Sequence, residues 1–143
     1  MAAKSSTFDS DLLKLIFQAI AIANVADNAA GAPLTNLYVS LHTVAPTVGG
    51  SQTTSEAAYT GYARVAVART AGGWTVTGSS VSPAATITFP AATAGSETEA
   101  FFAVGTASTG AGKVLYFGAI APTIAVAAGV TPQLTTASAV TES

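Results

Sequence analysis

Apolar residues recur at helical spacing over the first part of the chain. The pattern predicts a helix over residues 8–26, with Ser6 or Thr7 as its N-cap. A Gly-Ala-Pro sequence at residues 31–33 is expected to end it, because glycine adopts the left-handed cap conformation and proline cannot continue a helix. Residues 1–30 are therefore interpreted as an N-terminal helix with its cap.

The predicted helix has two apolar faces instead of one. The first contains Leu12, Leu15, Ile16, Ala19, Ile22 and Ala23, and the second contains Leu13, Phe17 and Ile20. Either the helix lies across a sheet in the core, or its second face meets another subunit. Periodicity alone does not separate these alternatives, so Leu13, Phe17 and Ile20 are candidate interface residues.

From residue 34 onward the pattern changes to period two, which is typical of half-buried strands. Strands are predicted at residues 37–42 and 62–70, and Trp74–Thr77 is expected to pair with the second of them through the Gly72-Gly73 turn. Further short strands are predicted at residues 86–89, 100–106, 114–120, 123–127 and 131–135. The fold class is mainly β: an antiparallel β-sandwich or barrel-like domain over residues 31–143, forming one compact domain with the N-terminal α-helix.

The composition excludes several classes of protein. Only 8% of the 143 residues are charged, against about a quarter in an average domain. A net charge of −2 argues against nucleic-acid binding, and the longest apolar run is too short and too interrupted to cross a membrane. The chain has no cysteine and one histidine, so thiolate chemistry and a multi-histidine metal centre are excluded, and no cofactor is expected.

Few residues are candidates for catalysis. His42 is predicted to be a surface or interface imidazole hydrogen-bonded locally, near Ser40, because no Gly-x-Ser-x-Gly elbow surrounds any serine. Glu97 and Glu99 lie in a polar run that is typical of a solvated loop end. The glycines between residues 105 and 112 fit a hairpin turn better than a phosphate loop, because a strand pattern follows them. The protein is therefore not expected to be an enzyme.

The remaining charges and one long connection are candidates for contacts between subunits. Arg64 could form an intersubunit salt bridge with Glu56 or Glu97, or it could simply set strand register and solubility. Arg69 is expected to be paired or to snorkel near a strand end. Residues 44–58 carry no clear period, and a connection of that length is usually functional or flexible.

Several segments resemble a family of small structural proteins from tailed bacteriophages. They are LTNLYVSLHT at 34–43, YTGYARVAVAR at 59–69, GWTVT at 73–77, ITFP at 87–90 and GTASTGAGKVLY at 105–116. Members of that family are labelled capsid decoration (cement) or tail-fibre proteins. One departure is the Val-Ala-Pro at 44–46, where the family often has Asp-Pro after the first strand.

The resemblance implies a virion component made in the host cytoplasm. The leading hypothesis is a capsid decoration protein on the capsid exterior, bound to the major capsid protein and to copies of itself as a homotrimer. The alternative is a tail or tail-fibre-associated protein involved in host attachment. The low charge fits either role, because unpaired charges are costly to bury in a symmetric assembly.

Overall fold

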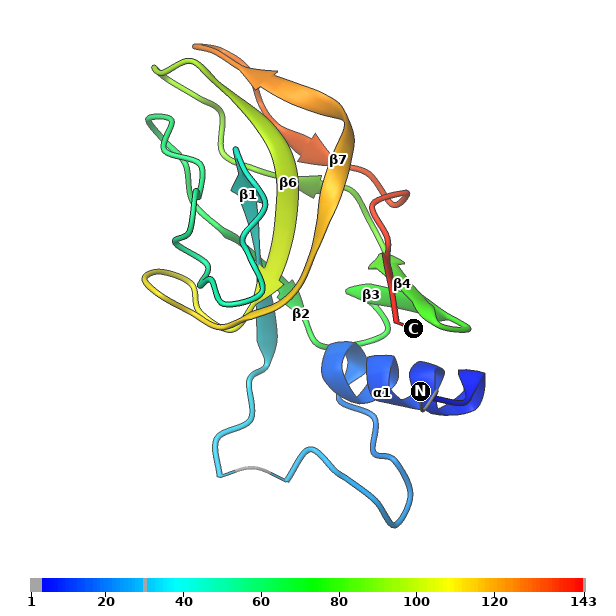
Figure 1. The fold of residues 1–143 in the computed structure, drawn as a ribbon. Coiled ribbons are helices and arrows are strands. Elements are labelled where there is room, and N and C mark those ends of the chain that lie inside the picture. The colour runs from blue at the N-terminus through cyan, green and yellow to red at the C-terminus, as the bar shows by residue number, and fades with distance from the viewer. Residues whose placement is uncertain (1–3, 30, 143) are drawn as a thin grey trace.

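A four-stranded antiparallel sheet organises the protein, as the computed structural model in Figure 1 shows for residues 4–29 and 31–142. Its strands are β1 (Asn36–His42), β2 (Val65–Ala68), β6 (Glu97–Gly105) and β7 (Val114–Val126), in the order β2-β1-β6-β7. The predicted alternation in β1 is confirmed, since Leu37, Val39 and Leu41 are all buried.

Two small antiparallel sheets complete the β structure. One contains β3 (Trp74–Thr77), β4 (Ser80–Pro83) and β9 (Val140–Thr141), and the other contains β5 (Ile87–Thr88) and β8 (Gln133–Leu134). Side chains from all three sheets meet in one apolar core, which includes Leu41, Phe102, Trp74, Val81 and Leu134. The mainly β fold class with an N-terminal helix is confirmed. The predicted boundary between helix and β domain falls on residue 30, outside the described residues.

The predicted hairpin at Gly72-Gly73 is wrong. The amide N–H groups of Gly73 and Trp74 both donate to Thr70 O, at 3.0 Å each, so the chain turns tightly there and leaves the main sheet. A Cβ on Gly73 would lie 2.2 Å from Ala68 O, which explains the glycine. β3 instead pairs with β4, across a turn at which Gly78 has a φ of +59°.

Strand lengths also differ from the sequence prediction. The two strands expected at residues 114–120 and 123–127 are one long strand, β7, whose pairing with β6 is irregular between Glu99 and Phe101. Neither β4 nor β9 was predicted, because two short strands of Ser, Pro, Val and Thr carry almost no period-two signal.

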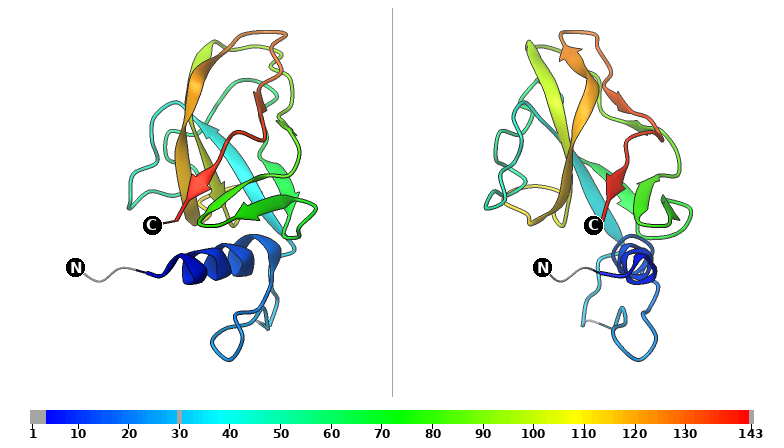
Figure 2. Two further views of the ribbon diagram at one scale, coloured as in Figure 1. Left: turned by 90° about the vertical axis from the view of Figure 1, so that its right-hand side faces the viewer. Right: turned by 45° about the vertical axis from the view of Figure 1, so that its right-hand side comes forward.

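The helix α1 (Ser6–Gln18) is shorter than the predicted 8–26. Ser5, not Ser6 or Thr7, is the N-cap, and its Oγ accepts a hydrogen bond from the Phe8 amide. Ala19 adopts a left-handed conformation with φ 57°, and the Ile20 amide donates back to Lys14 O, which ends the helix. Figure 2 shows α1 beneath the sheets, with β3 and β4 above it.

Candidate functional site

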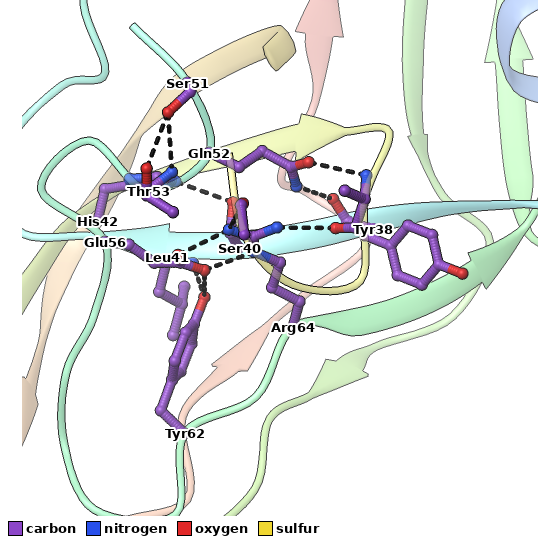
Figure 3. Close-up of polar contacts among 12 residues, drawn as sticks. Tyr38, Ser40, Leu41, His42, Ser51, Gln52, Thr53, Glu56, Tyr62 and Arg64 are labelled. Carbon is purple, nitrogen blue, oxygen red and sulfur yellow. Dashed lines mark hydrogen bonds and ion pairs between the residues drawn. The ribbon is translucent and has the colours of Figure 1, made fainter. Parts of the chain in front are cut away.

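A cluster of buried polar side chains lies where β1 meets two loops, residues 43–61 and residues 106–113 (Figure 3). These loops follow β1 and β6; the first is bonded to β1 and the two are bonded to each other. The cluster contains several of the polar residues that the sequence singled out, and their contacts in it show which role each of them has.

Glu56 and Arg64 form the strongest polar contact of the cluster. Arg64 Nε donates to Glu56 Oε1 at 2.6 Å, and Arg64 Nη2 donates to Glu56 Oε2 at 2.8 Å. This geometry is bidentate, and the hydrogen bond to Glu56 raises the pKa of Arg64. The expected pairing of Arg64 with Glu56 occurs, but within one chain, so the prediction of an intersubunit bridge by these two residues is wrong.

The ion pair connects both loops to the sheet. Arg64 also donates to Ala107 O at 2.9 Å and to Gly110 O at 2.8 Å, so one guanidinium holds both loops. The Tyr62 hydroxyl donates to Glu56 Oε1 at 2.9 Å and accepts from the Leu41 amide at 3.1 Å. Burial raises the pKa of Tyr62, so its hydroxyl stays protonated as a donor.

His42 is fully buried, which corrects the expectation of a surface or interface imidazole. Its Nδ1 lies 2.9 Å from Thr54 O, and its Nε2 lies 2.8 Å from Ser40 Oγ, so the predicted local hydrogen bonding is present. Burial lowers the pKa of His42, so the ring is neutral. Since a carbonyl only accepts, Nδ1 carries the proton and Nε2 accepts from the Ser40 hydroxyl.

This Ser-His contact resembles the nucleophile and base of a hydrolase only in its distance. Ser40 and His42 each have an exposed fraction of 0%, so no substrate can reach the hydroxyl. The third partner is the backbone carbonyl of Thr54 instead of a carboxylate. The pair therefore holds the loop against β1.

Gln52 is a functional residue of the cluster that the sequence analysis missed. Its buried amide accepts from the Ala107 N–H at 2.9 Å and donates to Tyr38 O at 3.3 Å. A Cβ on Gly105 or Gly112 would lie 2.1 Å from an atom of this amide. The glycines of the predicted β6–β7 hairpin turn are therefore required to make room for Gln52.

Glu97 and Glu99 are not at a solvated loop end, as the sequence suggested; both lie in β6. Glu97 Oε1 accepts from the amides of Ala58 and Tyr59, at 2.8 Å each. Glu99 is fully buried, and among the described residues no N–H or hydroxyl group donates to its carboxyl oxygens. Burial, followed by the charge of Glu97, raises the pKa of Glu99 to about 8.

Glu99 makes stability depend on pH in a direction that can be tested. Because its pKa is about 8 in the folded protein and 4.5 ordinarily, the folded state binds more protons between these values. Its contribution to stability is complete below pH 4.5 and is lost as the pH rises to about 8, at no more than about 1.4 kcal/mol per pH unit. We expect Glu99→Gln to flatten the fall in the free energy of unfolding, measured by urea titration from pH 5 to about pH 9.

The matched control for this prediction is Asp11→Asn, which removes a carboxylate from the half-exposed surface of α1. It is expected to leave the pH dependence of the parent protein in place. An unchanged slope in Glu99→Gln would contradict the assignment of a buried, protonated Glu99.

Arg69 caps the C-terminal end of α1. Its Nε donates to Ile16 O at 2.7 Å and its Nη2 donates to Leu15 O at 2.9 Å, so it satisfies carbonyls that the helix leaves open. Its Nη1 donates to Leu34 O at 2.7 Å, which ties the chain before β1 to the helix. Arg69 is thus paired with backbone, near the strand end at which the sequence placed it.

The candidate interface residues of the helix have different positions. Leu13 and Phe17 each have an exposed fraction of 0%, and the Phe17 ring lies 4.8 Å from that of Trp74. These two residues therefore pack inside their own chain, which corrects the expectation that they meet a neighbour. Ile20 follows the helix and is 48% exposed, so it remains a candidate for an interface.

The described part of the chain holds no group of three or more His, Cys, Asp or Glu side chains arranged for a metal ion. No helix within residues 4–29 and 31–142 is long and apolar enough to cross a membrane. The buried polar residues around β1 fix two loops, and the fold is that of a small β protein built around one core.

A small, mainly β protein with one N-terminal helix is the class that these observations define. The family model of the podophage GP4 fiber I protein gp80 matches residues 13–141, so the chain belongs to that family. The predicted resemblance to structural proteins of tailed phages is thereby confirmed. No curated protein matches the chain.

Proposed function

We propose that this protein is a structural subunit of a fibre on a podophage virion. The observation that carries the proposal is the family match over residues 13–141, whose description names a fiber protein. This reverses the order of the two hypotheses drawn from the sequence, in which capsid decoration came first.

The structure is compatible with a protein that binds or supports other subunits, and the side chains considered for catalysis are buried. Ser40 and His42 are inaccessible, and Glu99 is buried and protonated at neutral pH. The loops at 43–61 and 106–113 are held by Arg64 and Gln52, so the surface they present is fixed before any partner arrives. Val48, at the tip of the first loop, is completely exposed.

Copy number per virion tests the proposal directly. A fibre subunit is expected in a few to a few dozen copies per particle, at the tail, whereas a decoration protein covering the shell is present in hundreds. Quantitative mass spectrometry against the major capsid protein, together with antibody labelling of intact particles, measures both quantities. Hundreds of copies spread over the capsid would overturn the fibre assignment in favour of decoration.

Particles that lack the protein give a second readout. A fibre subunit predicts weaker adsorption to host cells with unchanged resistance of the capsid to heat and osmotic shock. A decoration protein predicts the opposite, since a partner that binds only the assembled shell stabilises it by mass action. Normal adsorption of the deficient particles would contradict a role in host attachment.

A further inference from the structure

A short apolar segment follows α1 and lies outside the core. Residues 19–27, which we call the arm, read AIAIANVAD and contain no charge before Asp27. Ile20 is 48% exposed and Val25 is 73% exposed. Figures 1 and 2 show the arm beyond α1, on the side away from the three sheets. A run of exposed apolar residues marks a contact with another molecule.

The arm is held by its own chain at both ends. Arg69 Nε donates to Ile16 O, before the arm, at 2.7 Å, and Arg69 Nη1 donates to Asn28 Oδ1, after it, at 3.1 Å. The arm therefore leaves the body of the protein and returns to it at one place. Because its ends are fixed, it keeps its direction away from the sheets of its own chain, and the molecule that covers it comes from outside.

The tip of the arm is a tight turn with one free edge. The Ile22 N–H donates to Ala26 O at 2.7 Å, and the Ala26 N–H donates to Ile22 O at 3.0 Å. In an antiparallel pair the N–H and C=O groups of successive residues face opposite sides, so those of Ala21 face away from this turn. Within the described residues Ala21 makes no backbone hydrogen bond. The arm thus presents an unpaired strand edge at Ala21.

A groove of about 310 Å³ lies between β2 and residues 85–88, which lead into β5. The residues that line it come from these two segments and from the Gly72-Gly73 turn, and all are Val, Ala, Gly, Thr or Ile. Such small, uncharged side chains let another backbone approach closely. The groove therefore suits an extended, uncharged segment of chain.

The first wall of the groove is the edge of the main sheet. The Arg69 N–H donates to Thr35 O at 2.9 Å, toward β1. Because these directions alternate along a strand, the N–H and C=O groups of Ala66 and Ala68 face away from β1. Ala68 O accepts from the Thr70 amide, whereas the Ala68 N–H and both groups of Ala66 make no hydrogen bond in the described part of the chain.

The second wall is also a strand edge. The Phe89 N–H donates to Pro132 O at 2.9 Å, toward the chain that forms β8. By the same alternation the N–H and C=O groups of Thr88 face away from β8, and across residues 4–29 and 31–142 they have no backbone partner. Unpaired strand edges are templates for pairing with another chain, and this groove has one on each side.

We propose that the arm of a second copy lies in this groove and adds to the edge of β2, with Ala21 opposite Ala66. The N–H and C=O groups of these two residues then exchange hydrogen bonds, which supply affinity when a strand is added to a sheet. The arm matches the groove in three respects, since it is exposed, uncharged up to Asp27 and unpaired at its edge. Burying it desolvates no charge.

The contact joins two different surfaces, so each copy donates one arm and accepts one. Such contacts close as a two-fold exchange or as a ring, and a ring of three would give the homotrimer that the sequence analysis expected. The inference goes beyond the proposed function and holds equally for a fibre subunit and for a decoration protein. Its test measures association of the purified chain, whereas copy number tests the place in the virion, so each can fail alone.

Cysteine pairing tests the arrangement, since the natural chain contains no cysteine. Differently tagged Ala21→Cys and Ala66→Cys chains are mixed under mild oxidation, and we expect disulfides that join the two different variants. Ala91→Cys is the matched control for Ala66→Cys, because it makes the same substitution at an exposed alanine outside the groove. Equal disulfide formation with the control, or none at any protein concentration, would overturn the proposal.

A chain that carries both Ala21→Cys and Ala66→Cys separates exchange between copies from closure within one chain. Exchange predicts disulfide-linked oligomers whose yield rises with protein concentration. An internal disulfide as the main product in dilute solution would show that the arm serves its own groove, and it would overturn the proposal.

Sedimentation velocity over a wide range of concentrations measures the association itself. We expect a reversible oligomer that Ile20→Asp weakens about tenfold or more, because it brings a charge into an uncharged groove. Ala32→Asp is the matched control, since it adds the same charge to the same connection at an exposed position beyond the arm. A parent protein that is monomeric throughout, or an oligomer indifferent to Ile20→Asp, would contradict the inference.

Ala66→Pro tests the backbone pairing. It removes the N–H that faces the groove and leaves the bonds of β2 to β1 in place, because the N–H of Ala66 faces away from β1. We expect loss of the oligomer with an unchanged circular dichroism spectrum. Ala66→Lys is the second variant, which guards the same edge with a charge and keeps the N–H. Undiminished association of a folded Ala66→Pro or of Ala66→Lys would contradict strand addition at β2.

Discussion

Phe17→Ala is expected to lower the free energy of unfolding by about 3–5 kcal/mol, the cost of removing a large buried aromatic side chain. Phe17 is completely buried, and its ring contacts two others, with centroids 4.8 Å from Trp74 and 5.6 Å from Tyr116. No other ring of α1 reaches the core, since Phe8 points away from it. A loss of this size is a large part of the stability of a domain of this length.

Trp74 is the single tryptophan of the chain and reports on this contact directly. Urea unfolding followed by Trp74 fluorescence and by circular dichroism separates two outcomes: both signals shift together if the whole domain is destabilised, and fluorescence shifts first if α1 detaches. Phe8→Ala is the control, because it removes the same ring from an exposed position of the same helix. Full stability of Phe17→Ala would contradict the position of Phe17 in the core.

The hydrophobic pattern of the chain predicted where strands lie better than it predicted which strands pair with each other. The alternation of Leu37, Val39 and Leu41 identified β1, because a strand with one buried face carries its own signal. The pairing of β3 with β4 instead of β2 depends on how tightly the chain turns at Thr70 and Gly73, and no hydrophobic pattern records that turn. Pairing between short strands is a tertiary property.

The two apolar stripes of α1 show the same limit. Both contain apolar residues of similar size, so the sequence could not tell which stripe faces the core. The stripe with Leu13 and Phe17, which was considered for an interface, is the one that packs against Trp74. The burial of Glu99 was missed for a related reason, since the polar run Gly-Ser-Glu-Thr-Glu is typical of a solvated turn, and only the pairing of β6 in the sheet shows that Glu99 is covered. For Arg64 the sequence offered Glu56 or Glu97 as a partner in another subunit; Glu56 is the partner, but within the same chain, which no pattern of charges along the sequence could decide.

Glu56→Gln is the second substitution with a large expected effect, a loss of about 3–5 kcal/mol. The substitution leaves the guanidinium of Arg64, whose side chain is 3% exposed, without its counter-charge, and an uncompensated buried charge costs more than the pair contributes. Tyr62 also loses the carboxylate that accepts the hydrogen bond of its hydroxyl. Asp27→Asn, which removes an exposed carboxylate, is expected to change stability by less than about 0.5 kcal/mol.

The positions at which hydrogen exchange becomes faster show whether the ion pair of Glu56 and Arg64 holds the two loops or has no structural role. Because Arg64 holds both loops, Glu56→Gln should speed hydrogen exchange at the amides of Thr43 and Ala57, which bind Ser55 O and Leu41 O across the loop. Replacing both partners, as Glu56→Leu with Arg64→Met, should recover part of the loss, since neither charge is then left buried alone. Two results together would contradict this role: a free energy of unfolding of Glu56→Gln equal to that of the parent, and a lower one for the double variant. Gln52 and His42 alone would then have to hold the loops.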